Sequence, residues 1–248
     1  MTATADARPV VEAFGVSKTF RIPHERREKL KDYVLHPRAS YEENQALSNM
    51  DVSVRSGEFF GIIGPNGSGK STLLKILAGI YRPTTGSVRI TGSLTPFIEL
   101  GVGFHPELSG RDNVRINGTL LGMTKADLDA KFDEIFEFAE VERFVDQKLK
   151  DYSTGMHQRL AYAVAVQMPS QILFLDEVLA VGDERFHRKC HNTFLKMQAE
   201  KKTVVLVTHD LPWVNAFCDR ALLLRNGRAE MCGPSGDVIE HYLETQAD

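Results

Sequence analysis

The segment GIIGPNGSGKST, residues 61–72, has the spacing G-x-x-x-x-G-K-S that is typical of a phosphate-binding loop. Gly67 and Gly69 let main-chain N–H groups turn toward phosphate oxygens without interference from a Cβ atom. Lys70 can place a positive charge on the β- and γ-phosphates, and the hydroxyl of Ser71 can reach Mg²⁺. A glycine-rich turn that binds nothing is the alternative, but the complete pattern argues against it. The predicted nucleotide-binding residues are Gly64, Asn66, Gly67, Ser68, Gly69, Lys70, Ser71 and Thr72.

Two further apolar runs end in residues that suit the hydrolysis of a phosphate bond. ILFLDE, residues 172–177, should be a buried strand ending at Asp176, whose carboxylate can hold Mg²⁺ through water. Glu177 follows directly and can polarise an attacking water. VLVTHD, residues 205–210, has the same layout, and His209 at its end can stabilise charge on the γ-phosphate. Behind a phosphate-binding loop, these runs predict a nucleotide hydrolase whose catalytic residues are Glu177, His209 and Lys70.

The stretch DYSTGMHQR, residues 151–159, is predicted to open a helix that continues through LAYAVAVQM. Ser153 is a good N-cap residue and Gly155 leaves the backbone uncovered, so the free N–H groups of the first turn can receive an anion. The turn carries no lysine of its own to hold that anion. It is therefore either a simple helix cap or one half of a site whose other half lies elsewhere.

The composition limits the class of protein. The chain has 248 residues, 42% of them hydrophobic and 25% charged, which is ordinary for a soluble globular protein with a substantial core. Its formal net charge of −3 argues against a general nucleic-acid binder. No apolar run reaches the roughly 18 residues of a membrane span, and the N-terminus lacks the layout of a signal peptide. The 3 cysteines are scattered, which fits a reduced cytosol.

The elements that must position these residues alternate between strands and helices. Apolar and alternating runs predict strands at 10–20, 46–57, 58–64, 86–93 and 94–100, and a helix at 70–81. Residues 110–168 should be mainly helical. The runs at 171–177 and 203–210 should be strands covered on both faces. This order predicts an α/β fold with a parallel sheet and a helical insertion in the middle.

Together these motifs resemble those of ABC-type ATPases. That family carries a second motif, typically L-S-G-G-Q followed by Q-R, whose place is taken here by YSTGM and HQR, residues 152–159. The resemblance implies one nucleotide-binding domain over residues 1–248: a P-loop NTPase with a RecA-like parallel-sheet core, an N-terminal antiparallel β part, an insertion at 21–45 and a helical subdomain over about 100–168. It also implies that the turn at Ser153 meets ATP held by the P-loop of a second subunit, which explains the missing lysine. The residues implied to contact the partner's ATP are Ser153, Thr154, Gly155, Met156 and Asp183.

The resemblance assigns further residues to ATP and Mg²⁺. Phe20 stands where the family places an aromatic ring against adenine, although a half-buried residue at a strand end is an equal alternative. Family members usually carry a glutamine that touches Mg²⁺ and the membrane partner, but the segment at 95–114 has none. Glu99 is the nearest functional replacement, and Leu100 is the alternative under a one-residue shift. The implied Mg²⁺ ligands are Ser71, Asp176 and Glu99.

Three segments indicate which group of ABC-type ATPases the chain resembles. ELGVGFHPELSGRDN (99–113), YSTGM (152–156) and DEVLAVGDERF (176–186) resemble ATPase subunits that export lipid-linked polysaccharides such as O-antigen, teichoic acid, capsule and galactan. This implies two copies that sandwich two ATP molecules and a polytopic permease dimer, contacted by the loop Gly101–Glu107. Coupling to the polysaccharide would be indirect, nucleic acid would not be a partner, and the chain would lie on the cytoplasmic face of the cell membrane. Some members add a C-terminal carbohydrate-binding domain, which this chain is expected to lack.

Two other classes of protein fit the sequence less well. A soluble ABC-type ATPase acting on DNA or ribosomes usually has a long coiled coil between the two motifs, or two cassettes in one chain. Here Lys70 and Ser153 are only 83 positions apart. A small-molecule P-loop kinase does not explain the Ser153 turn. An ABC motor for another substrate is the remaining alternative. The basic part of the insertion, residues 21–38, is either a solvated loop or a surface that lies against the membrane or the permease.

Overall fold

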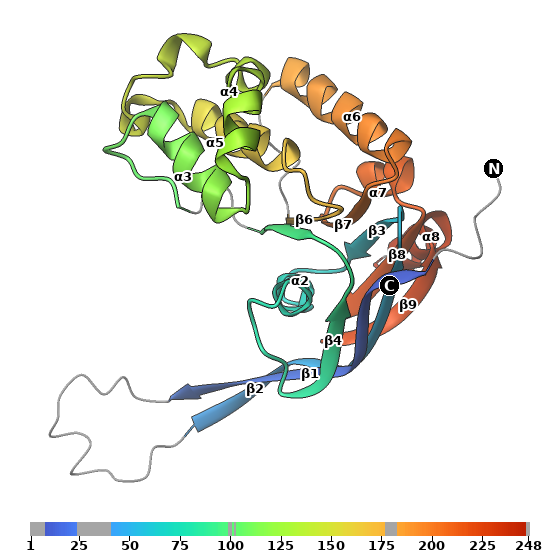
Figure 1. Cartoon of the computed structure of the whole chain (residues 1–248). Helices are drawn as coiled ribbons and strands as arrows, with labels where there is room; N and C mark the ends of the chain where they lie inside the picture. The colour runs from blue at the N-terminus through green and yellow to red at the C-terminus, as the bar shows by residue number, and fades with distance from the viewer. Residues whose placement is uncertain (1–7, 24–40, 99–100, 102, 177–182, 247–248) are drawn as a thin grey trace, which may run out of the picture.

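The part of the chain that the structure describes is built around two β-sheets (Figure 1). The computed structural model describes residues 8–23, 41–98, 101, 103–176 and 183–246. An antiparallel sheet has the order β2-β1-β4, with β1 at Pro9–Pro23, β2 at Tyr41–Arg55 and β4 at Thr85–Ile90. A second sheet has the order β5-β6-β7-β3-β8-β9. Its strands are β5 (Leu94–Phe97), β6 (Ile172–Asp176), β7 (Thr203–Val207), β3 (Phe59–Ile63), β8 (Arg220–Arg225) and β9 (Arg228–Pro234).

The second sheet is parallel from β5 to β8, and only β9 runs antiparallel. Its central strands are apolar along their whole length because both faces are covered. On β6, Leu173 and Leu175 pack toward the helices that follow β6 in the chain, whereas Ile172 and Phe174 pack toward α2 (Lys70–Leu77) and the antiparallel sheet. The helices on the first of these faces include α6 (Glu184–Ala199), α7 (Leu211–Phe217) and α8 (Ser235–Glu244).

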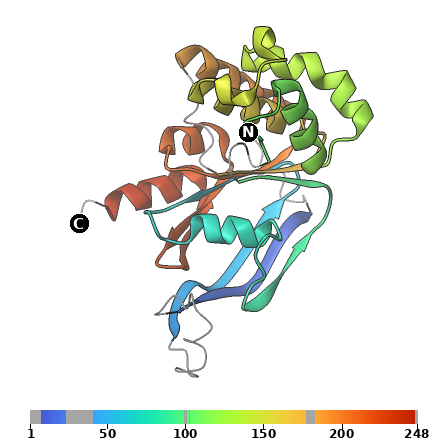
Figure 2. The same ribbon diagram turned by 90° about the vertical axis from the view of Figure 1, so that its left-hand side faces the viewer.

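The helical subdomain has a hydrophobic core of its own. It comprises α3 (Gly110–Leu120), α4 (Lys125–Ala139) and α5 (Thr154–Val166), with short 3-10 turns at Glu142–Phe144 and Leu149–Asp151. Figure 2 shows these helices stacked on one side of the molecule, with the antiparallel strands on the opposite side. Every residue of α5 from Leu160 to Val166 is buried. Leu160 and Val164 face the core of the subdomain, but Ala161 and Tyr162 face the core over the sheet, so α5 belongs to both cores.

The β1–β2 hairpin is longer than the sequence predicted. The first strand was expected to end near residue 20, yet Arg21 pairs with Glu43 and Ile22 pairs with Glu42. Arg21 Nε also lies 3.1 Å from Glu43 Oε1. The residues of this extension are exposed and those of β2 are polar, so the sequence there has no alternation of apolar residues that would predict a strand. The remainder of the predicted insertion, residues 24–40, lies outside the described residues.

Candidate nucleotide-binding site

The three predicted catalytic motifs emerge at one edge of the parallel sheet. Strands β3, β7 and β6 are neighbours, with Ile62 opposite Val207 and Val207 opposite Asp176. The glycine-rich loop therefore leaves β3 beside Asp176, and His209 follows two residues beyond the end of β7, where it is exposed. Ligands of open α/β sheets bind at the carboxyl ends of the strands. Glu177 follows Asp176 in the sequence and lies outside the described residues.

The backbone of the loop can be built only with glycine at two positions. Gly64 has φ of +144°, and a Cβ atom there would lie 2.1 Å from the main-chain oxygen of Leu224. Gly69 has φ of +105°, and its Cβ would lie 2.8 Å from the oxygen of Ala46. The first glycine lets the loop pass against β8 and the second lets it pass against β2. The G-x-x-x-x-G-K-S spacing is thus a requirement of close backbone packing as well as of phosphate binding.

The N-terminus of α2 is arranged to receive a phosphate. Its N-cap is Gly69, which provides no side-chain hydrogen bond, and the first turn holds no acidic residue. The first N–H groups of a helix have no partner inside the helix, and the helix dipole favours an anion in front of them. Lys70 is buried, and its Nζ donates to the main-chain oxygens of Gly64 at 2.8 Å and Pro65 at 3.0 Å. These bonds hold its charge against the loop.

A cavity of about 670 Å³ opens in front of this loop. Its far wall comes from the β1–β2 hairpin and from the turn between β8 and β9. The turn is fixed to the loop because Gly227 N donates to Ser68 O at 3.0 Å. The sequence motifs gave no signal for these walls, because they come together only where β2 of the antiparallel sheet meets the β8–β9 turn of the second sheet, with Ser48 N donating to Gly227 O at 2.8 Å. The residues of the cavity wall that the sequence analysis missed are Asn44, Gln45, Ala46, Asn226 and Gly227.

Phe20 lies in the same cavity as the glycine-rich loop. Its ring is held edge-to-face by Tyr81, with ring centroids 5.8 Å apart, and Lys18 Nζ lies 5.1 Å from the centroid of Phe20. The ring is partly exposed rather than part of either buried core. This placement supports the stacking alternative over the simple strand-end alternative, and the contact with adenine stays a prediction.

Replacing Phe20 with alanine should raise the KM for ATP about five- to tenfold and leave kcat nearly unchanged. Stacking of a base on an aromatic ring contributes on the order of 1–3 kcal/mol, and it acts equally on the ground state and the transition state. Phe14→Ala is the matched control because Phe14 is exposed on the same strand and outside the cavity lining. Steady-state ATPase kinetics would decide, and equal KM values for the two variants would refute the assignment.

The Ser153 turn is both a helix cap and an open surface. Ser153 Oγ accepts a hydrogen bond from Met156 N at 3.2 Å, which leaves its hydroxyl hydrogen available to donate. Among the residues that the structure describes, no atom outside the neighbouring backbone lies within 4 Å of a Cβ placed on Gly155, so this side of the backbone is open. The turn is anchored by Tyr152, whose Oη donates to Phe144 O at 2.7 Å. Burial of the phenol raises the pKa of Tyr152 to about 12. A rigid anchor thus presents an exposed first helical turn, which includes Thr154.

Within one chain, this turn is separate from the loop cavity. No described residue of α5 lines that cavity, and Figure 1 places α5 among the upper helices and α2 below them beside the sheet. Asp183 begins the neighbouring helix α6, where its Oδ1 accepts from Phe186 N at 3.0 Å. That backbone bond, together with the charges of Arg159 and Arg185, lowers the pKa of Asp183. The glycine-rich loop and Phe20 share one cavity, Asp176 and His209 lie at the ends of the strands next to that loop, and neither helix cap lines the cavity.

Only two of the three predicted Mg²⁺ ligands, Ser71 and Asp176, are among the residues that the structure describes. Ser71 is exposed in the first turn of α2, and Asp176 ends β6 at the same sheet edge. A hydroxyl and a carboxylate are the hard oxygen donors that Mg²⁺ prefers, and Mg²⁺ beside a nucleotide takes its remaining ligands from phosphate and water. These residues therefore fit the ion. Glu99 and its alternative Leu100 lie outside the described residues.

Comparison with known proteins identifies the family. The family model described as ABC transporter matches residues 47–180, which span the loop, the helical subdomain and β6. An O-antigen export system ATP-binding protein of Klebsiella pneumoniae is 36% identical over 244 residues, which cover 96% of this chain and 99% of that protein.

The chain belongs to the ABC transporter family. An O-antigen export system ATP-binding protein of Myxococcus xanthus is 45% identical over 199 residues, covering 80% of this chain but 46% of the relative, so the chain spans less than half of that protein. A teichoic acids export ATP-binding protein of Lactiplantibacillus plantarum is 35% identical over 96% of this chain and 65% of the relative.

The fold agrees with solved ABC structures. A dimeric ATP-binding cassette in a post-hydrolysis state, bound to ADP and phosphate, is 26% identical, with a TM-score of 0.72 over 91% of this chain and 98% of its own. The predicted P-loop NTPase fold, the ABC resemblance and the assignment as an ATPase are therefore confirmed. The cavity in front of the glycine-rich loop is the candidate ATP site of this ABC ATPase.

Proposed function

We propose that this chain is the ATP-hydrolysing subunit of an exporter that moves lipid-linked cell-surface polysaccharide across the cytoplasmic membrane. The names of its relatives support this, because O-antigen and teichoic acids are both cell-surface polymers and the relatives are export ATP-binding proteins. The three segments that depart from the common ABC pattern support the same substrate class. An ABC motor for another substrate is the second candidate.

Within the proposed site, residues of the first copy bind ATP and prepare its γ-phosphate. Lys70 and the N–H groups of α2 neutralise charge on the phosphates, and His209 stabilises charge that develops on the γ-phosphate. Ser71 and Asp176 would hold Mg²⁺, which supplies further neutralisation of the phosphate oxygens when it is bound. Glu177 accepts a proton from the attacking water and orients it toward phosphorus.

The second copy completes the site. The observation that carries this proposal is the open Ser153 turn, which presents a hydroxyl and uncovered backbone but lies apart from the ATP cavity of its own chain. A twofold dimer would place this turn and Asp183 of each copy against the ATP of the other. The dimeric cassette with ADP and phosphate is a precedent for two copies, and the ATP contacts made by Ser153, Thr154, Gly155 and Met156 are our proposal.

The loop Gly101–Glu107 is the proposed contact with the permease. Phe104 packs edge-to-face on His157 of α5, with ring centroids 5.1 Å apart. Glu107 forms ion pairs with Lys148 at 3.2 Å and Lys150 at 3.1 Å, in the segment that leads to the Ser153 turn. Pressure on this loop would therefore reach the turn that meets ATP. None of the described helices has both the length and the apolar character needed to cross a bilayer.

Purification from detergent-solubilised membranes tests the proposal. The tagged chain should bring down a polytopic membrane protein, and cells without the chain should retain lipid-linked polysaccharide on the cytoplasmic side of the membrane. A control with the Lys70→Ala chain should recover the same partner without restoring export. An exclusively soluble pool that carries DNA or ribosomes would refute the proposal, and so would normal surface polysaccharide in cells that lack the chain.

A further inference from the structure

Glu140 lies where the helical subdomain meets the helix that follows the ATP site. It is the C-cap residue of α4 and adopts the left-handed conformation, with φ of +59° and ψ of +42°. Few residues other than glycine and asparagine adopt this conformation at a helix end, because the side chain crowds the backbone. Here it directs the chain away from α4 at the point where α5 and α6 approach.

Three cations from two helices surround the carboxylate of Glu140. Lys189 Nζ lies 2.8 Å and Arg185 Nε lies 3.3 Å from Oε1, and both belong to α6. Arg159 Nη1, from α5, lies 3.4 Å from Oε2. The side chain of Glu140 is only 22% exposed, so solvent screens these pairs less than it screens surface pairs. The hydrogen bond from Lys189, followed by the charges of all three cations, lowers the pKa of Glu140 and keeps it ionised at neutral pH.

The two helices that Glu140 joins are those that begin at the proposed contacts with the partner's ATP. Helix α5 begins after Ser153 and carries Arg159 in its second turn, whereas α6 begins after Asp183 and carries Arg185 in its first turn. The guanidinium of Arg159 also lies 6.0 Å from the ring centroid of Phe186 in α6. The cluster of Glu140, Arg159, Arg185 and Lys189, named here the Glu140 cluster, is therefore the polar contact between these two helix starts.

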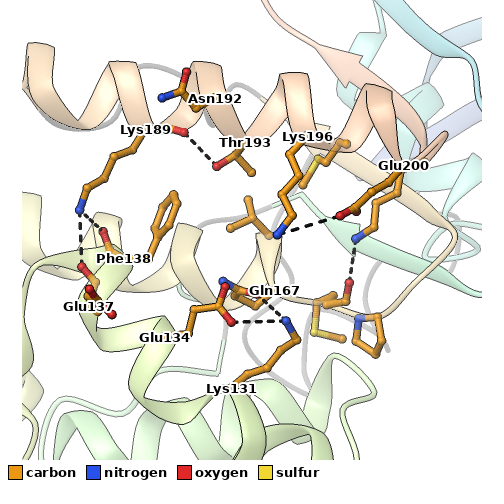
Figure 3. Close-up of a pocket in the computed structure, with 15 residues that line it drawn as sticks. Lys131, Glu134, Glu137, Phe138, Gln167, Lys189, Asn192, Thr193, Lys196 and Glu200 are labelled. Atoms are coloured by element: carbon orange, nitrogen blue, oxygen red, sulfur yellow. Dashed lines mark hydrogen bonds and ion pairs between the residues drawn. The ribbon is translucent and has the colours of Figure 1, made fainter.

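Beyond this cluster the junction between α4 and α6 opens into a groove of about 580 Å³ (Figure 3). Lys131 pairs with Glu134 and Gln167 on the subdomain side, and Lys196 pairs with Glu200 within α6. Lys189 is different because it crosses to α4 and donates to Phe138 O at 3.2 Å as well as pairing with Glu140. Apolar packing also joins α6 to the subdomain, because the ring of Phe186 contacts Phe138 and Tyr162 edge-to-face. The Glu140 cluster adds the directional polar contact beside this packing, between the starts of α5 and α6.

We propose that Glu140 is a positioning residue for ATP hydrolysis: it fixes the start of α5 relative to the start of α6, so that Ser153 and Asp183 reach the partner's ATP together. The proposal rests on the two-subunit site described above. Loss of the carboxylate would leave three cations close together and would let the two helix starts separate. A displacement of about 1 Å in such groups costs up to roughly a hundredfold in rate.

The test uses a double-mutant cycle with Glu140→Gln, Lys189→Gln and both changes in the full chain. Glu140→Gln should lower kcat of the ATPase about tenfold or more, while the affinity of the monomer for ATP changes less than twofold, because the ATP cavity of the same chain is intact. Lys189→Gln should act in the same direction, and the double variant should be no worse than Glu140→Gln alone. Glu137→Gln is the control, because Glu137 is exposed three residues earlier on α4 and forms no ion pair among the described residues.

A second measurement separates positioning from folding. In a Glu177→Gln background, ATP-driven dimerisation measured by analytical ultracentrifugation should weaken at least fivefold when Glu140→Gln is added. The thermal unfolding midpoints of the proteins with and without Glu140→Gln should be the same. Dimerisation and kcat equal to those of Glu137→Gln would overturn the positioning role. Additive losses for Glu140→Gln and Lys189→Gln would overturn it as well. If instead the parent shows no ATP-driven dimer and Ser153→Ala has full activity, the two-subunit site itself is wrong.

Discussion

Lys70→Ala is expected to lower kcat/KM for ATP hydrolysis by roughly 10²–10³-fold. Removing one preorganised group that stabilises transition-state charge has a cost of this size, and Lys70 supplies a whole charge in a buried site. Its Nζ is already fixed by the main-chain oxygens of Gly64 and Pro65, so little reorganisation is needed when phosphate binds. Release of phosphate measures the loss of turnover, and calorimetric titration with ATP measures the loss of nucleotide affinity.

The control for Lys70→Ala is Lys75→Ala in the last turn of the same helix. Both changes remove a lysine and substitute the best helix former, but only the first lies in the lining of the cavity in front of the glycine-rich loop. Lys75→Ala should stay within about twofold of the parent. Comparable activity in the two variants would show that the glycine-rich loop is not the phosphate site.

Glu177→Gln should reduce hydrolysis by roughly 10²–10⁴-fold and should trap a dimer that retains ATP. The amide keeps the shape of the side chain but cannot accept a proton from the attacking water, and a positioned general base contributes a factor of this size. ATP binding depends on other residues, so nucleotide affinity should persist. Light scattering coupled to size-exclusion chromatography would show ATP-dependent doubling of the mass.

Glu184→Gln is the matched control for this experiment. Glu184 is an exposed glutamate at the start of α6, paired with Arg188 within the same helix. Exposed pairs of this kind contribute little, so turnover should be that of the parent. Full turnover by Glu177→Gln would assign the base to another residue, whereas loss of turnover without a trapped dimer would contradict the two-subunit site.

The sequence predicted those parts of the candidate site that are formed by residues close together in the chain. The spacing from Gly64 to Ser71 specifies the loop, because the tight turn and the phosphate contacts involve consecutive residues. Asp176 and His209 could be placed at one sheet edge, because continuous apolar runs of that length indicate parallel strands covered on both faces. The helical character of residues 110–168 predicted the insertion in the middle of the sheet. These inferences needed only local patterns and the general rules of α/β folds.

The rest depends on contacts between distant segments. Asn44 and Asn226 line one cavity although 182 positions separate them, because β2 and the β8–β9 turn meet where Ser48 N donates to Gly227 O at 2.8 Å. Glu140 looks like any glutamate at the end of an acidic helix, because its three cations come from later segments. Charge and helix periodicity describe faces of single elements, and they carry no information about which faces meet.

Helix α5 has a consequence for how the protein unfolds. Because its residues from Leu160 to Val166 complete two hydrophobic cores at once, neither core can lose its packing without exposing apolar surface of the other. Shared burial of this kind couples local opening events into one transition. The helical subdomain should therefore melt together with the sheet, and the slowest amide exchange of the subdomain should be found along α5 rather than along α3 or α4.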